Sequence, residues 1–366
     1  MGTRAMILST LASLAVAGPP AAAEPGAVFT LTDEVASNSV LAFSRDAQGA
    51  LTPAGSFPTG GMGSGGGEGV LGSEGSVALS RNGRLLLVVN AGSDEVSSFL
   101  VEGAHLTLAD VAPSGGILPV SVTERDGVVY VLNAGGAGNI SALRVDELGR
   151  LHPIGGSSRP LGEAASGPAQ VSFDPSGDVL AVTEKAARAI VLYAIARDGQ
   201  ASPPRSFPSS GSVPFGFGFT RRDVLVVSEA AGGPAGTSAV SSYDVDGQDA
   251  TLVSGSVPDE QRAACWLVVT ANGRLAFVAN AASGDISSYS IGPWGELSLL
   301  AGSAGALPSG GKPLDLALAG GDRILYVLDA GNHGIVGFAS RGDGTLDPMG
   351  ALADGLPASA VGLAAR

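Results

Sequence analysis

Two glutamates end apolar segments of the chain in the same way. The segments read Val182-Thr183-Glu184 and Val227-Ser228-Glu229. Glutamate is not one of the residues that favour turns, so a purely local role at the end of a strand explains it poorly. Two neighbouring carboxyl groups can divide into an acid and a base if their surroundings separate their pKa values. We therefore predict that Glu184 and Glu229 are catalytic groups.

His333 is the alternative base. It is one of three histidines and lies four residues after Asp329, where a turn is expected. A neutral imidazole is a good general base near neutral pH. His105 and His152 fall in an expected hairpin and an expected outer strand, where we expect them to be solvated and without a role. An exposed loop histidine with no role is the other interpretation of His333.

The two glutamates belong to a repeating set of seven strand-end residues. Each follows an apolar run and carries a side-chain oxygen: Asp33, Asn90, Asn133, Glu184, Glu229, Asn280 and Asp329. Successive members are 57, 43, 51, 45, 51 and 49 residues apart. A period of about 40–50 residues is typical of the blades of a β-propeller.

Each repeat contains four short segments that alternate or run apolar, which favours strands. In one repeat, 168–173 is followed by the turn Asp174-Pro175-Ser176-Gly177 and by the segment that ends at Glu184. A third segment carries a large aromatic residue, as at Phe99, Tyr193, Tyr289 and Phe338. No segment sustains a helical period. The predicted fold class is all-β, a seven-bladed β-propeller of four-stranded antiparallel blades.

The first and last repeats are incomplete in a complementary way. The first begins at its second strand, with Val28-Phe29-Thr30-Leu31, whereas residues 359–363 at the C-terminus match the first strand of a later repeat, 75–79. We therefore expect the C-terminal strand to join the N-terminal blade. Closing the ring in this way removes the exposed edges of an open array.

The candidate substrate-binding residues follow from this arrangement. In a propeller, the turns that enter the first strands and those between the second and third strands surround the central channel at one face. The predicted binding residues on that face are Gln170, Trp266, Asp315, Asn90, Asn133, Asn280 and Asp329. Trp266 could stack on a ligand. For the asparagines and aspartates, hydrogen bonds to nearby turn backbone are the structural alternative.

The N-terminus reads as a signal peptide. Arg4 precedes an uncharged apolar stretch, a Gly-Pro-Pro breaker and Ala21-Ala22-Ala23. We predict a signal peptide at 1–23 and one propeller domain at 24–366, in a protein that is secreted or periplasmic. A membrane anchor is the alternative for residues 1–23. After cleavage we expect no membrane association, because no other stretch is long and apolar enough.

The charge and residue composition of the chain limit the kinds of molecule that it can bind. The formal net charge is −14, and Lys185 and Lys312 are the only lysines, so a nucleic-acid surface is excluded. Cys265 is the only cysteine, so no intrachain disulfide can form. We expect a monomer that acts on a small molecule without a cofactor, although a divalent cation is not excluded. The nine glycines of the stretch 60–75 favour either a flexible lid or a plain linker.

Several catalytic and binding motifs have no support. No Gly-x-Ser-x-Gly elbow occurs, and three scattered histidines with one cysteine do not make a zinc site. The segment 61–66 matches a dinucleotide pattern but opens no helix. The segment 244–249 looks calcium-like, but a hairpin turn explains it better.

The segments Phe173-Asp174-Pro175-Ser176-Gly177 … Val182-Thr183-Glu184 and Val269-Thr270-Ala271-Asn272-Gly273 … Val278-Ala279-Asn280 resemble repeats of the seven-bladed lactonase family. That family groups 6-phosphogluconolactonase-like proteins with the carboxymuconate cyclase type. The resemblance covers residues 27–366. Members often carry Pro-His at the entry to a first strand. The matching second positions here are Gly75, Val120, Ala169, Phe215, Cys265 and Leu314, so no histidine is carried over.

The resemblance implies a lactonase-like hydrolase, or a lactonising cyclase, that acts on a small lactone at the channel face, and the predicted signal peptide indicates that it is secreted. A non-catalytic propeller that binds a small molecule, a glycan or a protein is the alternative. A third hypothesis is hydrolysis assisted by a divalent metal, with oxygen ligands from the seven strand-end residues.

Overall fold

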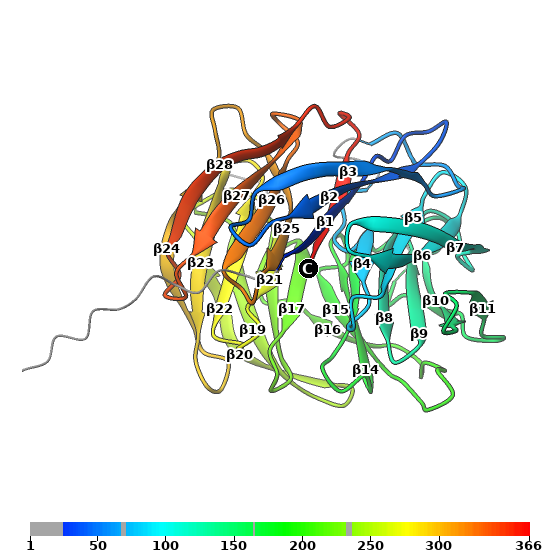
Figure 1. Cartoon of the computed structure of the whole chain (residues 1–366). Helices are drawn as coiled ribbons and strands as arrows, with labels where there is room; N and C mark the ends of the chain where they lie inside the picture. Colours follow the sequence, from blue (N-terminus) through cyan, green and yellow to red (C-terminus); the bar gives the residue numbers. More distant parts are fainter. Residues whose placement is uncertain (1–24, 67–70, 164, 232–235) are drawn as a thin grey trace, which may run out of the picture.

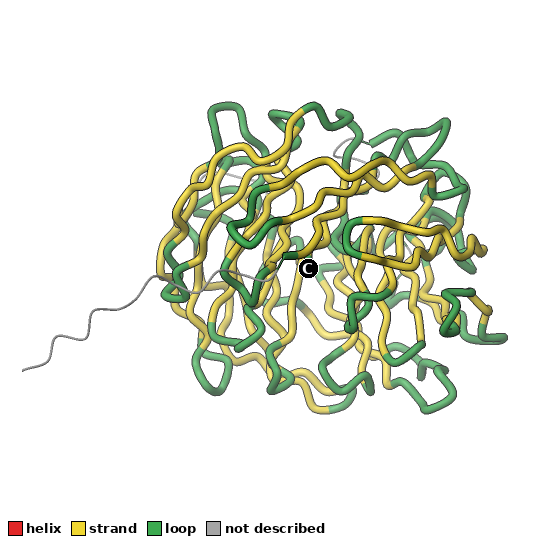
Figure 2. The backbone as a smooth tube through the Cα atoms, in the orientation of Figure 1, coloured by secondary structure: helices red, strands yellow, loops and turns green. Residues whose placement is uncertain are grey.

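The computed structural model describes residues 25–66, 71–163, 165–231 and 236–366. Within these ranges the regular elements are all strands, arranged as a ring of sheets (Figures 1 and 2). No helix in the described part is long and apolar enough to cross a membrane. The predicted signal peptide, 1–23, lies outside the described residues, so its cleavage stays a prediction.

Seven antiparallel sheets form the blades, numbered here in chain order, which confirms the predicted fold class. The innermost strands, from blade 1 to blade 7, are β29 (Val361–Ala365), β4 (Val77–Leu79), β8 (Pro119–Arg125), β13 (Pro168–Phe173), β17 (Pro214–Phe219), β21 (Ala264–Val269) and β25 (Pro313–Ala319). The second strands are β1 (Gly26–Leu31), β5 (Leu85–Asn90), β9 (Val128–Asn133), β14 (Val179–Glu184), β18 (Val224–Glu229), β22 (Leu275–Asn280) and β26 (Ile324–Asp329).

The outer half of each blade is equally regular. The third strands are β2 (Ser39–Arg45), β6 (Glu95–Glu102), β10 (Asn139–Val145), β15 (Ala189–Ala194), β19 (Ala239–Asp246), β23 (Asp285–Ile291) and β27 (Gly334–Ser340). The outermost are β3 (Leu51–Pro58), β7 (His105–Pro113), β16 (Arg205–Pro208), β20 (Asp249–Pro258), β24 (Leu297–Ala306) and β28 (Leu346–Asp354). In blade 3 two short strands, β11 (Leu151–Pro153) and β12 (Arg159–Pro160), both pair with β10.

Burial explains why the second strands read as continuous apolar runs. Strands β14, β18 and β26 are buried at every residue, because blades pack against both of their faces. The outermost strands are mostly exposed. Large side chains fill the space between blades, and Tyr130, Tyr193, Tyr289 and Tyr326 are fully buried. Each tyrosine hydroxyl donates to a backbone carbonyl well away in sequence, as Tyr326 does to Gly49 at 2.8 Å.

Ring closure takes the form expected from the incomplete terminal repeats. Strand β29 pairs antiparallel with β1, with Val28 opposite Ala365 and Thr30 opposite Leu363. Thr30 Oγ1 donates to the carbonyl of Val361 at 3.3 Å, and the backbone N–H of Arg366 donates to the carbonyl of Ala27 at 2.9 Å. The C-terminal strand lies beside the N-terminal blade in Figure 1. The chain therefore closes its ring without covalent help.

The inner strands are irregular where they begin. The pairing of β13, β17, β21 and β25 with their neighbours shifts register within the first few residues of each strand. Such bulges re-aim side chains at the rim of a sheet. They fall at the mouth of the channel, where a site was predicted, and they involve Gln170, Trp266 and Asp315.

Candidate functional site

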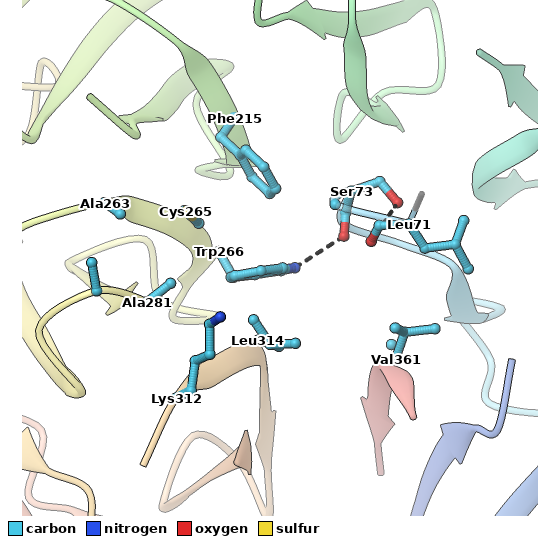
Figure 3. Close-up of a pocket in the computed structure, with 13 residues that line it drawn as sticks. Leu71, Ser73, Phe215, Ala263, Cys265, Trp266, Ala281, Lys312, Leu314 and Val361 are labelled. Carbon is cyan, nitrogen blue, oxygen red and sulfur yellow. Dashed lines mark hydrogen bonds between the residues drawn. The ribbon is translucent and has the colours of Figure 1, made fainter. Parts of the chain in front are cut away.

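A cavity of about 400 Å³ opens at the channel face, among the entries to the inner strands (Figure 3). Its walls, called the channel cavity below, come from blades 5, 6 and 7, the closing strand and a segment ahead of β4. The lining residues are Leu71, Gly72, Ser73, Phe215, Ala263, Cys265, Trp266, Ala281, Ala282, Lys312, Leu314, Val361 and Gly362. Most are apolar, and this volume suits a small molecule.

The segment 71–75 spans the channel from blade 2 to the opposite side of the ring. Ser73 Oγ donates to the carbonyl of Val120 in blade 3 at 2.7 Å, and the N–H of Glu74 donates to the carbonyl of Ala169 in blade 4 at 3.0 Å. Trp266 Nε1 of blade 6 donates to the carbonyl of Ser73 at 3.0 Å, the dashed line in Figure 3. Bonds to three blades make this segment the floor of the cavity. The lid-or-linker prediction for 60–75 included 67–70, which lie outside the described residues.

Lysine is confined to the cavity region. Lys312 lies on the wall. Lys185 Nζ donates to the carbonyl of Gly72 at 2.6 Å and lies 5.0 Å from the centre of the Phe215 ring, a cation–π contact. Burial lowers the pKa of Lys185. The chain has no other lysine, so both lysine charges of a strongly acidic protein lie beside this one cavity.

Two carboxyl groups are buried next to the cavity floor. Glu74 Oε2 accepts from the N–H of Leu267 at 3.2 Å. Asp315 Oδ1 accepts from the N–H of Leu316 at 2.7 Å, and its Oδ2 accepts from the N–H of Leu363 in the closing strand at 2.9 Å. Burial raises the pKa of Asp315 to about 8. Burial, and then repulsion by Asp315, raises the pKa of Glu74 well above its usual range.

The inner strands of blades 5 and 6 approach each other closely beside Glu74. A Cβ on Gly216 would lie 2.7 Å from the carbonyl oxygen of Cys265 and would also overlap Glu74 Oε2, so the inner strand of blade 5 needs glycine there. Cys265, on the cavity wall, is also perturbed, because burial raises the pKa of its thiol to about 12. A thiol of this kind stays protonated near neutral pH and is a poor nucleophile.

Glu184 and Glu229 are buried at equivalent positions, as the repeat predicts, but neither lines the channel cavity. Glu184 Oε1 accepts from the N–H of Gly162 at 2.8 Å, and burial raises the pKa of Glu184. Glu229 accepts from the N–H of Gly211 at 2.8 Å, from the Ser256 hydroxyl at 2.7 Å and from the Ser241 hydroxyl. Each carboxyl group thus holds the loop that enters its own blade. A catalytic role for either stays a prediction.

The other strand-end residues make similar contacts. Asp33 Oδ1 accepts from the N–H of Ser64 at 2.8 Å, and Asp329 Oδ1 accepts from the N–H of Lys312 at 2.8 Å. Asn90, Asn133 and Asn280 each donate to a serine hydroxyl on the third strand of their own blade, Ser97, Ser141 and Ser287 respectively. All seven are almost fully buried. Substrate binding by Asn90, Asn133, Asn280 and Asp329 stays a prediction.

The remaining predicted site residues are dispersed. Trp266 lies on the cavity wall, and Asp315 lies next to the wall residue Leu314. Gln170 joins the inner strands of blades 4 and 5, since its Oε1 accepts from the N–H of Phe217 at 2.6 Å and its Nε2 donates to the carbonyl of Phe217 at 3.1 Å. His333 is exposed in a turn of blade 7, with φ of 54°, and does not line the cavity.

The sequence contained a signal for the residues that were missed. Lys185, Lys312 and Phe215 break the repeat, because no other blade has their type at the same place. The rarity of lysine was visible without a structure. Glu74 also breaks the repeat, since the matching positions hold proline or alanine: Pro119, Pro168, Pro214, Ala264 and Pro313.

No protein-family model matches the sequence, and no curated protein is similar to it. Solved structures share its fold. A proposed 6-phosphogluconolactonase from Bacteroides uniformis ATCC 8492 aligns over 92% of this chain and 99% of its own, with a TM-score of 0.72 and 16% identity. The periplasmic gluconolactonase of Pseudomonas aeruginosa aligns over 93% and 99%, with a TM-score of 0.71 and 17% identity. Virginiamycin B lyase from Staphylococcus aureus is less similar, with a TM-score of 0.54 and 14% identity over 77% of this chain and 86% of its own.

Proposed function

We propose that this lactonase-like propeller is an exported, monomeric hydrolase that opens a small lactone in the channel cavity. One observation carries the proposal: the cavity combines aromatic and aliphatic walls with both lysines of the chain. The predicted signal peptide, and the periplasmic location in the name of one structural neighbour, support export.

The lysine charges suit the chemistry of ester opening. When water attacks a lactone carbonyl, negative charge develops on the carbonyl oxygen. A cation fixed in an enclosed, weakly polar cavity stabilises that charge more than the same cation in water. Lys312 is the charged residue on the wall, so we assign the stabilising role to it. Lys185 holds the floor segment through Gly72, which makes it a positioning residue.

The base that activates water is a second part of the proposal. Glu184, Glu229 and His333 are the candidates predicted from the sequence. The structure adds Glu74, which follows the wall residue Ser73 and whose raised pKa would make its ionised form a stronger base. No group of three or more His, Cys, Asp or Glu suited to a metal occurs in the described part of the chain. A chelator therefore serves as a control in the assay.

The test is hydrolysis of a panel of lactones, followed by acid release at constant pH. Lys312→Met should lower kcat by about 10²-fold if its charge stabilises the oxyanion. The matched control is Arg205→Met, which removes an exposed cation from the outer strand of blade 4. Equal turnover in Lys312→Met and wild type would refute the role of Lys312, and no turnover of any lactone would refute the hydrolase.

A binding module is the second candidate function. It is favoured by the wall composition, because the cavity-lining residues within the described part of the chain include neither a histidine nor a carboxyl group. This candidate predicts that small ligands bind in the cavity and that no lactone is turned over. Ligand binding without turnover in the same panel would establish it.

A further inference from the structure

The polar atoms on the wall of the channel cavity are largely engaged before any ligand arrives. The carbonyl of Ser73 accepts from Trp266 Nε1, and the carbonyl of Gly72 accepts from Lys185 Nζ. Ser73 Oγ, the hydroxyl among the described wall residues, donates to the carbonyl of Val120. These bonds use the hydroxyl donor of the floor and one lone pair of each carbonyl, so the floor keeps only acceptor positions for a ligand that carries many hydroxyl groups.

Backbone carbonyl groups on the wall formed by blades 6 and 7 also accept hydrogen bonds from other protein groups. The carbonyl of Ala263 accepts from the N–H of Ala281 at 2.9 Å, and the carbonyl of Ala282 accepts from Arg262 Nη2 at 2.9 Å. The carbonyl of Lys312 accepts from the N–H of Ala330 at 2.9 Å. The other polar side-chain groups among the described wall residues are the ammonium group of Lys312 and the weakly polar thiol of Cys265.

The apolar part of the wall is built for a flat or compact apolar group. The rings of Phe215 and Trp266 meet edge to face, 5.1 Å apart between centroids and at 63°. Figure 3 shows the Trp266 indole directed across the cavity toward Ser73, with Leu314 beside it and Val361 facing it. Aromatic walls of this kind bind a ligand through contact area and ring stacking.

We infer that the ligand is an apolar lactone, carrying an aromatic ring or a short alkyl chain, rather than a polyhydroxylated sugar lactone. This inference rests on the proposed function, because it names the substrate of the same cavity. The carbonyl of such a lactone faces Lys312, and its hydrocarbon part packs on Phe215 and Trp266. A sugar lactone would bury several hydroxyl groups against a wall that is mainly apolar and has few polar groups, and each hydroxyl group left without a partner costs binding free energy.

The first experiment compares two δ-lactones. Hydrolysis of 3,4-dihydrocoumarin and of δ-gluconolactone is followed at constant pH. Each kcat/KM is divided by the spontaneous rate constant of the same lactone, because dihydrocoumarin expels a phenolate and gluconolactone a less stable alkoxide. We expect this ratio to be at least about 100-fold higher for dihydrocoumarin, the order by which an apolar pocket discriminates against an added hydroxyl group. An equal or higher ratio for gluconolactone would overturn the inference and leave the lactonase proposal intact.

The second experiment separates ligand class from catalysis. α-Tetralone has the same fused rings as dihydrocoumarin but no ester to open. Its binding is measured by the fluorescence of Trp266 in a Trp294→Phe protein, where the exposed second tryptophan has been removed. Gluconate is the hydroxylated comparison. Binding of α-tetralone but not gluconate supports the inference even if no lactone is hydrolysed, and in that case only the proposed hydrolase fails.

A matched pair of variants locates the binding. Phe215→Leu should weaken α-tetralone binding about 10-fold, whereas Phe207→Leu, on the outer strand of blade 4, should leave it unchanged. A melting curve for each variant verifies that it is folded. If α-tetralone does not bind wild type, or binds Phe215→Leu as tightly as wild type, the inferred ligand class is wrong.

Discussion

The seven strand-end residues and the walls of the channel cavity belong to the same face of the ring, but they differ in how they are built. The strand-end residues recur once per blade, are almost fully buried, and hold inter-blade loops and neighbouring strands. The cavity walls come from an asymmetric set of blades and contain residues that occur once. The other repeats do not have the same residue types at the positions that match Lys185, Lys312, Trp266 and Glu74.

This difference separates two kinds of chemistry in a repeat protein. A residue type that recurs at one position of every repeat meets a need that every repeat has, and here that need is to fix the loop that enters the blade. A residue that breaks the repeat meets a need of the whole ring. The carboxyl and amide groups of the seven strand-end residues therefore form a clear repeat in the sequence, but they do not line the cavity. The two lysines follow no repeat, and they lie beside it.

The first prediction is that opening the ring also destroys the channel cavity. Strand β29 closes blade 1, and it supplies Val361 and Gly362 to the cavity wall. Deletion of 358–366 should abolish the cooperative fold or cause aggregation, since β1 would lose its paired inner strand, and β4 and β25 of the adjacent blades would lose the strand packed between them. Size-exclusion chromatography and a melting curve are the measurements. Arg366→Ala, which keeps the backbone of the strand, is the control, and a monomeric deletion protein with the wild-type melting temperature would refute the closure.

The second prediction concerns how the two buried carboxyl groups beside the cavity floor, Asp315 and Glu74, make the stability of the protein depend on pH. The folded protein holds protons on Asp315 and Glu74 at pH values where the unfolded chain has lost them. The free energy of unfolding should therefore fall as pH rises from about 4, and the contribution of Asp315 should level off above about 8. Urea unfolding at pH 5, 6, 7 and 8 measures this slope.

Asp315→Asn should make that slope shallower, although the variant is less stable at every pH because its amide faces two N–H donors. A free energy of unfolding that is constant between pH 5 and 8 in wild type would contradict the raised pKa values. An unchanged slope in Asp315→Asn would assign the pH dependence to other buried carboxyl groups such as Glu184, whose pKa is also raised by burial.

The third prediction concerns the strand-end residues themselves. Glu229→Gln replaces one carboxylate oxygen with an amide group, so one of the bonds from Gly211, Ser241 and Ser256 is lost. We expect the free energy of unfolding to fall by about 1–3 kcal/mol and kcat per folded molecule to stay at the wild-type value. Exposed Glu102→Gln is the control. A fall in kcat of about 10²–10⁴-fold with unchanged stability would instead establish Glu229 as an acid/base catalyst.

Most of the fold could be predicted from the sequence, because each blade shows the same strand pattern and the copies support one another. Seven copies of a strand ending in Asn, Asp or Glu fixed the number of blades, and the match between 75–79 and 359–363 fixed how the ring closes. The third-strand aromatics Phe99, Tyr193, Tyr289 and Phe338 are all buried, as their positions predict. Each of these features depends on local pattern and on burial, which a sequence records directly.

The candidate site could be predicted only in part. Trp266 was placed at the channel mouth by its register, and it lies on the cavity wall. The direction of a strand-end side chain depends on which loop donates hydrogen bonds to it, as Gly162 does to Glu184, and no spacing in the sequence encodes that donor. The reach of 71–75 across the ring depends on contacts with Val120, Ala169 and Trp266, which are distant in sequence.

The last prediction is the smallest expected effect, and it tests the histidine among the candidate bases. His333 is exposed, has φ of 54°, and does not line the channel cavity. Asparagine tolerates this left-handed backbone better than most residues, so His333→Asn removes the imidazole at little structural cost. We expect the free energy of unfolding to change by less than about 0.5 kcal/mol, as for most exposed substitutions. We also expect kcat and its pH profile to match wild type, because a general base must reach the proton that it removes. A large fall in kcat with an unchanged melting curve would place the chemistry beside blade 7 and outside the cavity.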